Sequence, residues 1–135
     1  MVNANNQIAD SVWLDLNTKA DFDGNPDLLP DVMAISNSLW NLFRCPIGSR
    51  GPIFQPEYGT YILQLVHEPL DEITANKIRI FVIQAIQRWE PRIHIDMSRT
   101  TVVPDSKIPA FRARIYYTLV GLGVNANTNL IFPKF

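Results

Sequence analysis

Three glutamates are the residues of this chain most suited to acid–base chemistry. Glu57 directly follows a proline, whereas Glu68 and Glu90 directly precede one. Hydrolysis of a glycoside needs two carboxyl groups about 5 to 9.5 Å apart, one of which donates a proton. In an extended turn the same carboxylate can instead accept backbone N–H bonds or pair with an arginine. A cell-wall glycoside hydrolase therefore stands as the alternative function at this point.

No metal, nucleophile or phosphate motif accompanies these acids. Cys45, His67 and His94 are single residues far apart in the chain, without the paired spacing of a metal site. The chain has no Gly-x-Ser-x-Gly elbow, and the run 48–51 lacks the Lys-Ser/Thr pair of a phosphate-binding loop. We therefore expect no catalytic residue, no metal and no cofactor, and we predict that the protein is not an enzyme.

The triplet Glu90-Pro91-Arg92 predicts a rigid corner between a helix and a strand. Proline lacks the N–H that continues a helix, and it forces the preceding residue into an extended conformation. We expect the corner to hold the acid and the arginine at its tip, where the planar guanidinium offers a fork to carboxylates or carbonyls of a partner. These three residues are the first candidates for partner binding.

Two helices must position this corner. Residues 31–44 carry apolar side chains along one stripe, with a polar face opposite that includes Asn37 and Ser38. Residues 72–89 carry a second stripe, and Asp71 supplies the N-cap. Between the helices we expect a proline- and glycine-rich loop of fixed shape over 45–59 and a short helical turn over 60–66.

The helix over 72–89 is apolar on a second side as well. Ile73, Ile80 and Ile83 lie far round the cylinder from the main stripe, among polar side chains. Such a helix is either enclosed within its own domain or presents one side to another chain. Both interpretations stay open, and Ile80 and Ile83 join the candidate partner-binding residues.

Alternating apolar residues predict the strands. Short strands are expected over 11–17 and 92–97, a longer one over 111–119, and a last one over 129–132. The link through residues 104–106 predicts a hairpin. The order of elements indicates an α+β fold, with two main helices packed on a small antiparallel sheet and a short N-terminal strand.

Composition limits the class of protein. The 135 residues include 12 basic and 13 acidic side chains, a formal net charge of −1 that does not favour nucleic acid as a partner. No apolar run approaches the ~20 residues of a membrane helix, and the polar N-terminus lacks a signal-peptide pattern, so we expect a cytoplasmic origin without membrane contact. We divide the chain into a flexible N-terminal arm, 1–10, and one domain, 11–135.

Taken in succession, four motifs resemble the contractile-tail baseplate wedge family of phages. That family also includes baseplate components of type VI secretion systems and of contractile bacteriocins. The resemblance extends over about residues 12–122, and the Glu-Pro-Arg corner is its most characteristic feature. The motifs are Asn37-Ser38-Leu39-Trp40-Asn41-Leu42, Pro56-Glu57-Tyr58-Gly59, Glu68-Pro69 and Trp89-Glu90-Pro91-Arg92-Ile93.

The resemblance implies a structural, non-enzymatic protein of the virion tail baseplate, assembled in the host cytoplasm. The partners it implies are the wedge core proteins and the tail sheath protein, with the tail tube or hub as a further neighbour, and the implied copy number is six per particle. The family's corner, here Glu90, Pro91 and Arg92, is implied to bind the helical core of the wedge. Extended arms of the sheath are expected to add to an open sheet edge by β-augmentation.

The loop before the second motif departs from the family pattern. Members often carry Gly-Glu-Arg-Pro there, whereas this chain reads Gly-Ser-Arg-Gly-Pro over 48–52, and His67 replaces a common phenylalanine before Glu-Pro. We nevertheless expect Arg50, Phe54 and Tyr58 of this loop to help anchor the protein in the wedge.

Overall fold

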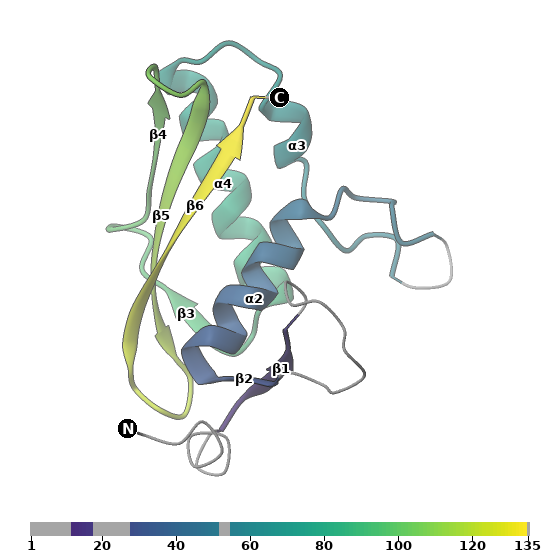
Figure 1. The fold of residues 1–135 in the computed structure, drawn as a ribbon, viewed down its shortest axis with the longest axis vertical. Coiled ribbons are helices and arrows are strands. Elements are labelled where there is room, and N and C mark those ends of the chain that lie inside the picture. The colour runs from purple at the N-terminus through teal and green to yellow at the C-terminus, as the bar shows by residue number, and fades with distance from the viewer. Residues whose placement is uncertain (1–11, 18–27, 52–54, 135) are drawn as a thin grey trace.

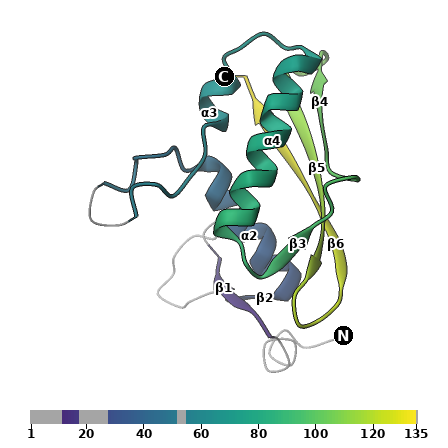
Figure 2. The ribbon, with the colours of Figure 1, turned by 180° about the vertical axis from the view of Figure 1, so that it is seen from behind.

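Two helices pack against one face of an antiparallel sheet in the computed structural model, which describes residues 12–17, 28–51 and 55–134 (Figure 1). The reverse view shows a separate pair of short strands beside the lower end of the helices (Figure 2). The α+β fold expected from the sequence is confirmed. The predicted arm, residues 1–10, lies outside the described residues.

The long helices have the bounds that the sequence predicts. α2 spans Asp31–Arg44 and α4 spans Glu72–Trp89, with a short helix, α3, at Ile62–Leu65. Asp71 caps α4 as expected, because its side chain accepts a hydrogen bond of 2.7 Å from the backbone N–H of Thr74.

The polar face predicted for α2 is buried in part. Asn37 is only 2% exposed, and its side-chain amide donates to the backbone oxygen of Leu16 at 2.8 Å. The N-terminal segment covers this side of the helix, a long-range contact that the helical period cannot reveal.

The two ends of the loop between α2 and α3 are joined to each other, and residues 52–54 of the predicted loop 45–59 lie outside the described residues. Pro46 and Thr60 form an isolated parallel bridge, and the N–H of Thr60 donates to the oxygen of Cys45 at 3.0 Å. A Cβ on Gly59 would lie 2.3 Å from that oxygen, and the φ of Gly59 is +123°. Only glycine fits this close approach without displacing the backbone.

One long strand, β5 (Ala110–Leu119), organises the main sheet. Along one side it pairs with β3 (Ile93–Ile95) and β4 (Thr101–Asp105), and along the other with β6 (Asn125–Pro133), always antiparallel. The alternation predicted over 111–119 is confirmed, because the buried side chains in that range are those of Phe111, Ala113, Ile115, Tyr117 and Leu119, and Ala110 at the start of β5 is buried as well.

Two strands of the main sheet differ from the prediction. β4 was not expected, since Pro104 and Asp105 predicted a turn, yet both belong to this strand. β6 begins four residues before the expected Asn129, because the polar run 125–128 pairs with β5. In both segments the partner strand, rather than local apolar alternation, decides the structure.

The N-terminal strand is shorter than predicted and does not join the main sheet. β1 spans Leu14–Leu16 and pairs with β2 (Leu28–Pro30), a strand that the sequence did not suggest. Leu14 and Leu16 are exposed, whereas Trp13, on the other face, packs against the core. The indole N–H of Trp13 also donates to the oxygen of Val120 at 3.3 Å.

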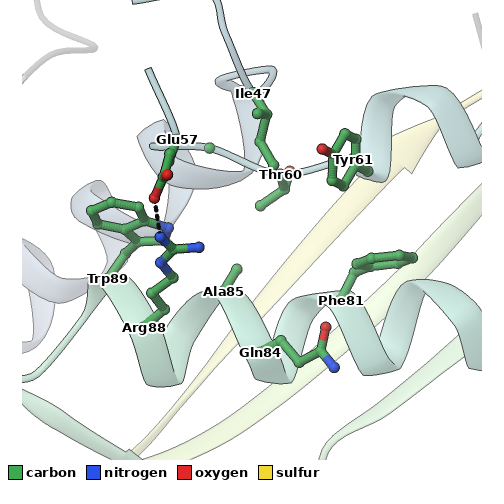
Figure 3. A pocket seen from close by; sticks show the side chains of 10 residues that line it. Ile47, Glu57, Thr60, Tyr61, Phe81, Gln84, Ala85, Arg88 and Trp89 are labelled. Carbon is green, nitrogen blue, oxygen red and sulfur yellow. Dashed lines mark hydrogen bonds and ion pairs between the residues drawn. The ribbon is translucent and has the colours of Figure 1, made fainter. Parts of the chain in front are cut away.

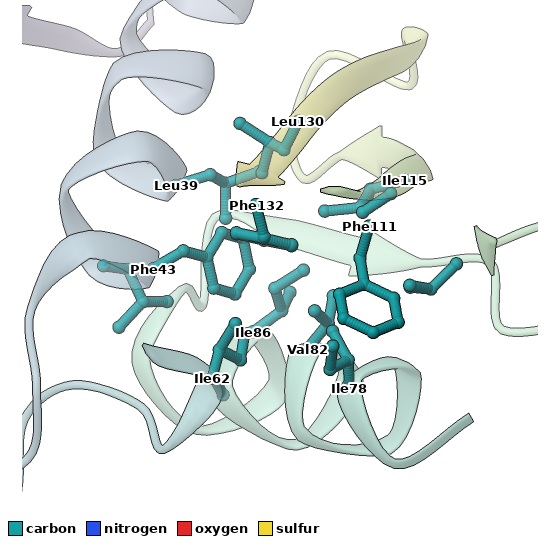
Figure 4. Close-up of a cluster of buried hydrophobic side chains, with 14 of the residues drawn as sticks. Leu39, Phe43, Ile62, Ile78, Val82, Ile86, Phe111, Ile115, Leu130 and Phe132 are labelled. Carbon is teal, nitrogen blue, oxygen red and sulfur yellow. The ribbon is translucent and has the colours of Figure 1, made fainter. Parts of the chain in front are cut away.

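Both long helices contribute to one core against the sheet (Figure 4). Phe43 of α2 meets Phe132 of β6 edge to face, with ring centroids 6.0 Å apart. From α4, the side chains of Ile78, Val82 and Ile86 are fully buried in the same cluster.

The second apolar side of α4 is only partly covered. Ile83 is 9% exposed, and Arg79, one turn earlier, donates to the oxygen of Thr100 at 2.8 Å, so this side faces the β3–β4 connection. Ile83 is therefore enclosed by its own domain and is withdrawn from the candidate partner surface. Ile73 and Ile80 remain exposed, at 70% and 51%.

Two isoleucines of α4 test this assignment of its faces. Ile78→Ala should lower the free energy of unfolding by about 3 kcal/mol, because it leaves a cavity in a closed core. Ile80→Ala, the matched control on the exposed side, should cost less than about 1 kcal/mol. Urea unfolding followed by tryptophan fluorescence measures both, and equal losses would contradict the assignment.

Candidate functional site

The Glu-Pro-Arg corner ends α4 and begins β3, as the sequence predicts. Glu90 follows the last helical residue, and Pro91 and Arg92 lead into the strand. The expectation that the acid lies at the tip is wrong, because Glu90 is only 3% exposed. A buried carboxylate is stable only when the protein supplies its hydrogen bonds, so the side chain turns inward toward partners of its own chain.

Arg92 and Ser38 satisfy the carboxylate of Glu90. The guanidinium donates from Nε to Oε1 at 2.6 Å and from Nη2 to Oε2 at 2.9 Å, and the Ser38 hydroxyl donates to Oε2 at 2.6 Å. Burial alone would raise the pKa of Glu90, but these bonds and the charge of Arg92 outweigh it and hold that pKa below its ordinary value. The pair therefore stays ionised and locks the corner to α2.

Trp13 lies next to this ion pair. The guanidinium carbon of Arg92 lies 6.0 Å from the centroid of the Trp13 ring, within the range of a cation–π contact. The backbone oxygen of Arg92 accepts from the N–H of Val120 at 2.8 Å. The sequence did not indicate Trp13 or Ser38 as site residues. Ser38 could have been found only from its place in the first family motif.

The loop residues Arg50 and Tyr58 stack beside the same corner. The guanidinium of Arg50 lies 3.8 Å from the centroid of the Tyr58 ring, which in turn meets the Trp89 ring at 5.2 Å between centroids. Burial raises the pKa of Tyr58, and the charge of Arg50 acts in the opposite direction. The structure thus brings two separate predicted groups, the loop and the corner, to one end of α4.

A shallow hollow of about 150 Å³ separates the loop from α4 (Figure 3). Tyr61 and Phe81 line one part of it, and an ion pair between Glu57 and Arg88 lies at the other end, beside Trp89. Both members of that pair are well exposed, so it contributes little to stability.

The remaining predicted site residues do not join this cluster. Ile80 lies ten residues before Glu90 on α4, a separation of about 15 Å along the helix axis. Ile83 is buried, as described above, and Phe54 lies outside the described residues.

The three candidate catalytic acids are each engaged elsewhere. Glu57 pairs with Arg88, Glu68 pairs with Lys77 at 3.1 Å, and Glu90 is held by the buried bonds of the corner. Glu57 and Glu90 line different hollows, and the pKa of Glu90 is lowered, whereas a general acid needs a raised one. This arrangement does not favour glycoside hydrolysis.

Metal-ligand clusters and membrane-spanning helices are absent from the part of the chain that the structure describes. Residues 12–17, 28–51 and 55–134 contain no group of three or more side chains arranged to hold a metal ion. Within the same ranges, no helix combines the length and the apolar character needed to cross a bilayer.

The outer edge of β6 is a second candidate site. Within the described residues β6 pairs only with β5, so its other edge has no strand beside it. The backbone oxygen of Val124 accepts from Leu119 of β5, and the backbone N–H of Lys134 donates to Pro109, directly before β5. Backbone groups alternate in direction along an antiparallel strand. Those of the even-numbered residues of β6 therefore point toward β5, and those of the odd-numbered residues point outward. The outward backbone groups belong to Asn125, Asn127, Asn129 and Ile131.

This edge lacks the usual protection against pairing. β6 contains no charged residue, and Pro133 stands only at its end. The opposite margin of the sheet is divided between β3 and β4, and β4 contains Pro104. Natural sheets protect long edges with charges, prolines or bulges, so a nine-residue edge with no charge and with a proline only at its last position is suited to accept another strand.

Comparison with known families decides the class of the protein. The family model of baseplate wedge protein gp25 matches residues 4–121. The chain belongs to this family. A curated relative, baseplate protein W of Escherichia phage P2, is 26% identical over 91 residues, which cover 67% of this chain and 71% of the relative.

Solved structures share the fold. A Geobacter sulfurreducens protein with the provisional name of tail lysozyme gives a TM-score of 0.63 at 22% identity, over 73% of this chain and 86% of that one. A baseplate chain of the postcontracted pyocin R2 gives a TM-score of 0.54 at 19% identity, over 87% of this chain and 97% of that one. A chain of the anti-feeding prophage baseplate gives a TM-score of 0.58 at 17% identity, over 91% of this chain and 86% of that one.

Family membership makes this gp25-family chain a structural wedge protein in the baseplate of a contractile tail or tail-like machine, among other baseplate proteins. The resemblance inferred from the four motifs is confirmed. Proteins of this family are generally structural, and the engaged acids described above agree with that role.

Acid titration tests the buried pair. The pKa of Glu90 is lower in the folded protein than in the unfolded chain, where it is about 4.3. The ionised carboxylate therefore adds its full contribution to the free energy of unfolding above that pH, and this contribution is lost as the pH falls through the folded-state pKa. Glu90→Gln should cost about 2 kcal/mol at pH 7, and the difference from wild type should narrow below about pH 5. Urea unfolding at pH 7, 5 and 3.5 measures this.

The exposed pair supplies the matched control. Glu57→Gln removes the partner of Arg88 in a solvent-exposed pair, and should change stability at pH 7 by less than about 1 kcal/mol. A Glu90→Gln cost that stays constant from pH 7 to pH 3.5 would contradict the assigned role of the ionised carboxylate.

Proposed function

We propose that this wedge protein joins the wedge core to the first sheath ring by accepting an extended arm of the sheath at β6. The observation that carries the proposal is the uncharged outer edge of β6, beside which none of the described strands lies. A strand added there gains backbone hydrogen bonds along the outward groups of the odd-numbered residues. Such bonds hold without a particular partner sequence, which suits a protein that starts a repeating ring.

The Glu90-Pro91-Arg92 corner is the proposed contact with the wedge core. Arg92 uses Nε and Nη2 to hold Glu90, and among the described residues no acceptor bonds its Nη1. The side chain is 19% exposed, so this remaining nitrogen is available to a carbonyl or carboxylate of a wedge helix. Arg50 and Tyr58 extend the same contact surface from the loop.

The two sites lie on opposite sides of β5, so one molecule can engage both partners at once. β3 leaves the corner and pairs with β5 at residues such as Leu119, and β6 pairs with the other side of β5. We propose that six copies occupy the baseplate with the tail tube or hub as a further neighbour, matching the sixfold symmetry of contractile tails. Baseplate movement then reaches the sheath through continuous sheet hydrogen bonds.

A proline on β6 tests the sheath contact. Asn127→Pro removes an outward-facing N–H without removing a bond to β5, so the domain should stay folded while the added strand loses part of its ladder. Baseplates carrying this variant should assemble but start sheath rings at least about tenfold less often, as counted by electron microscopy.

Asn127→Ser is the matched control, because serine keeps the N–H while shortening the same side chain. It should start sheath rings as wild type does. Thermal unfolding checks that both variants fold. Wild-type sheath initiation by a folded Asn127→Pro protein would refute β-augmentation at this edge.

A lysine at the corner tests the core contact. Arg92→Lys keeps the charge beside Glu90 but loses the planar fork, so we expect a folded protein whose binding to the wedge core complex weakens by more than about 1 kcal/mol. Pull-down or interferometry with that complex measures the change. Arg88→Lys, in the exposed pair with Glu57, is the control, and equal binding by both variants would contradict the proposal.

A further inference from the structure

A continuous groove runs along the open edge of β6, between this strand and α2. One hollow, of about 500 Å³, is lined mainly by apolar side chains, including Phe43, Leu63 and Phe132. A second, of about 710 Å³, follows β6 toward its N-terminal half. The two hollows share Trp40 and Arg44, so they form one groove with a deep end near α3.

The side chains of an added strand would enter this groove. On β6 the even-numbered residues, among them Leu130 and Phe132, face the helices, and residues of a neighbouring strand that lie opposite them face the same way. Alternate side chains of the incoming strand therefore point between β6 and α2. The volume of the deep end lies within the range of side-chain and ligand pockets, and its lining is largely apolar.

The described lining of the groove carries one positive charge, that of Arg44. Among the described residues that line it there is no aspartate or glutamate. The guanidinium of Arg44 lies 3.6 Å from the centroid of the Trp40 ring, which holds it at the groove wall. Among the described residues no carboxylate forms an ion pair with Arg44. An acidic side chain is the natural complement of this wall.

We propose that the groove selects an extended segment that carries a large apolar residue and an acidic residue two positions apart. Residues i and i+2 of a strand face the same side, so the apolar side chain fills the deep end while the carboxylate meets Arg44. The inference rests on the proposed β-augmentation and adds side-chain specificity to it. Backbone pairing alone would accept any strand, whereas this groove distinguishes among them.

Synthetic strands test the selection on the isolated protein. The probe is the nonapeptide acetyl-Thr-Val-Thr-Leu-Thr-Glu-Thr-Val-Thr-amide, compared with versions in which lysine replaces glutamate or serine replaces leucine. Calorimetry should show that the probe binds at least about fivefold more tightly than either version, and that its advantage over the lysine peptide shrinks in high salt. Equal binding of all three peptides, or no binding, would overturn the proposal.

Charge reversal locates the effect in the groove. Arg44→Glu should reverse the preference, so that the lysine peptide binds more tightly than the glutamate peptide. Arg99→Glu is the matched control, since Arg99 is also an exposed arginine stacked on a ring, 4.2 Å from the centroid of Tyr116, on the far face of the sheet. If Arg99→Glu changes the preference as much as Arg44→Glu does, the groove is not the selective element.

Sheath initiation separates this inference from the proposed function. Baseplates with Arg44→Glu should start sheath rings at least about fivefold less often than those with Arg99→Glu. If Asn127→Pro blocks initiation and Arg44→Glu does not, β-augmentation stands and side-chain selection fails. If sedimentation shows a dimer that Arg44→Glu dissociates, a second copy of the chain fills the groove and the proposal is overturned.

Discussion

The buried charge of Glu90 is the constraint on which the arrangement of the corner depends. A carboxylate that is 3% exposed must have its hydrogen bonds supplied by the protein, and here Arg92 and Ser38 supply them. These bonds join the end of α4, the start of β3 and the middle of α2 at one point, with Trp13 beside them. The Glu-Pro-Arg triplet therefore first stabilises the domain itself, and only the part of the Arg92 guanidinium that does not bond Glu90 is available to a partner.

The sheet connects the Glu90–Arg92 corner to the opposite side of the molecule. β3 leaves the corner and pairs with β5, which pairs along nearly its whole length with β6. The two surfaces that we propose for partners thus belong to one hydrogen-bonded layer, backed by a closed core on its helical face. A layer of this kind moves as a unit, because displacing one strand means breaking several bonds at once. That rigidity suits the proposed role of linking the wedge core to the sheath.

Elements whose signals are local could be predicted from the sequence. The apolar stripes of α2 and α4, the cap at Asp71 and the proline corner after α4 depend on neighbouring residues, and the structure confirms them. β4 and the first half of β6 could not be predicted, because their residues lack apolar alternation and become strands through pairing with β5. The inward turn of Glu90 likewise depends on Ser38, 52 residues earlier in the chain.

The sequence by itself determined the α+β class, the two long helices, the family resemblance and the importance of the Glu90-Pro91-Arg92 corner. These follow from residue periodicity, from the missing N–H of proline and from a succession of short motifs. Only the tertiary structure decided that Glu90 is buried, that Ile83 is enclosed while Ile80 is exposed, and that β6 has an open edge beside a positively charged groove. Burial and strand neighbours depend on residues distant in sequence, and local pattern does not contain that information.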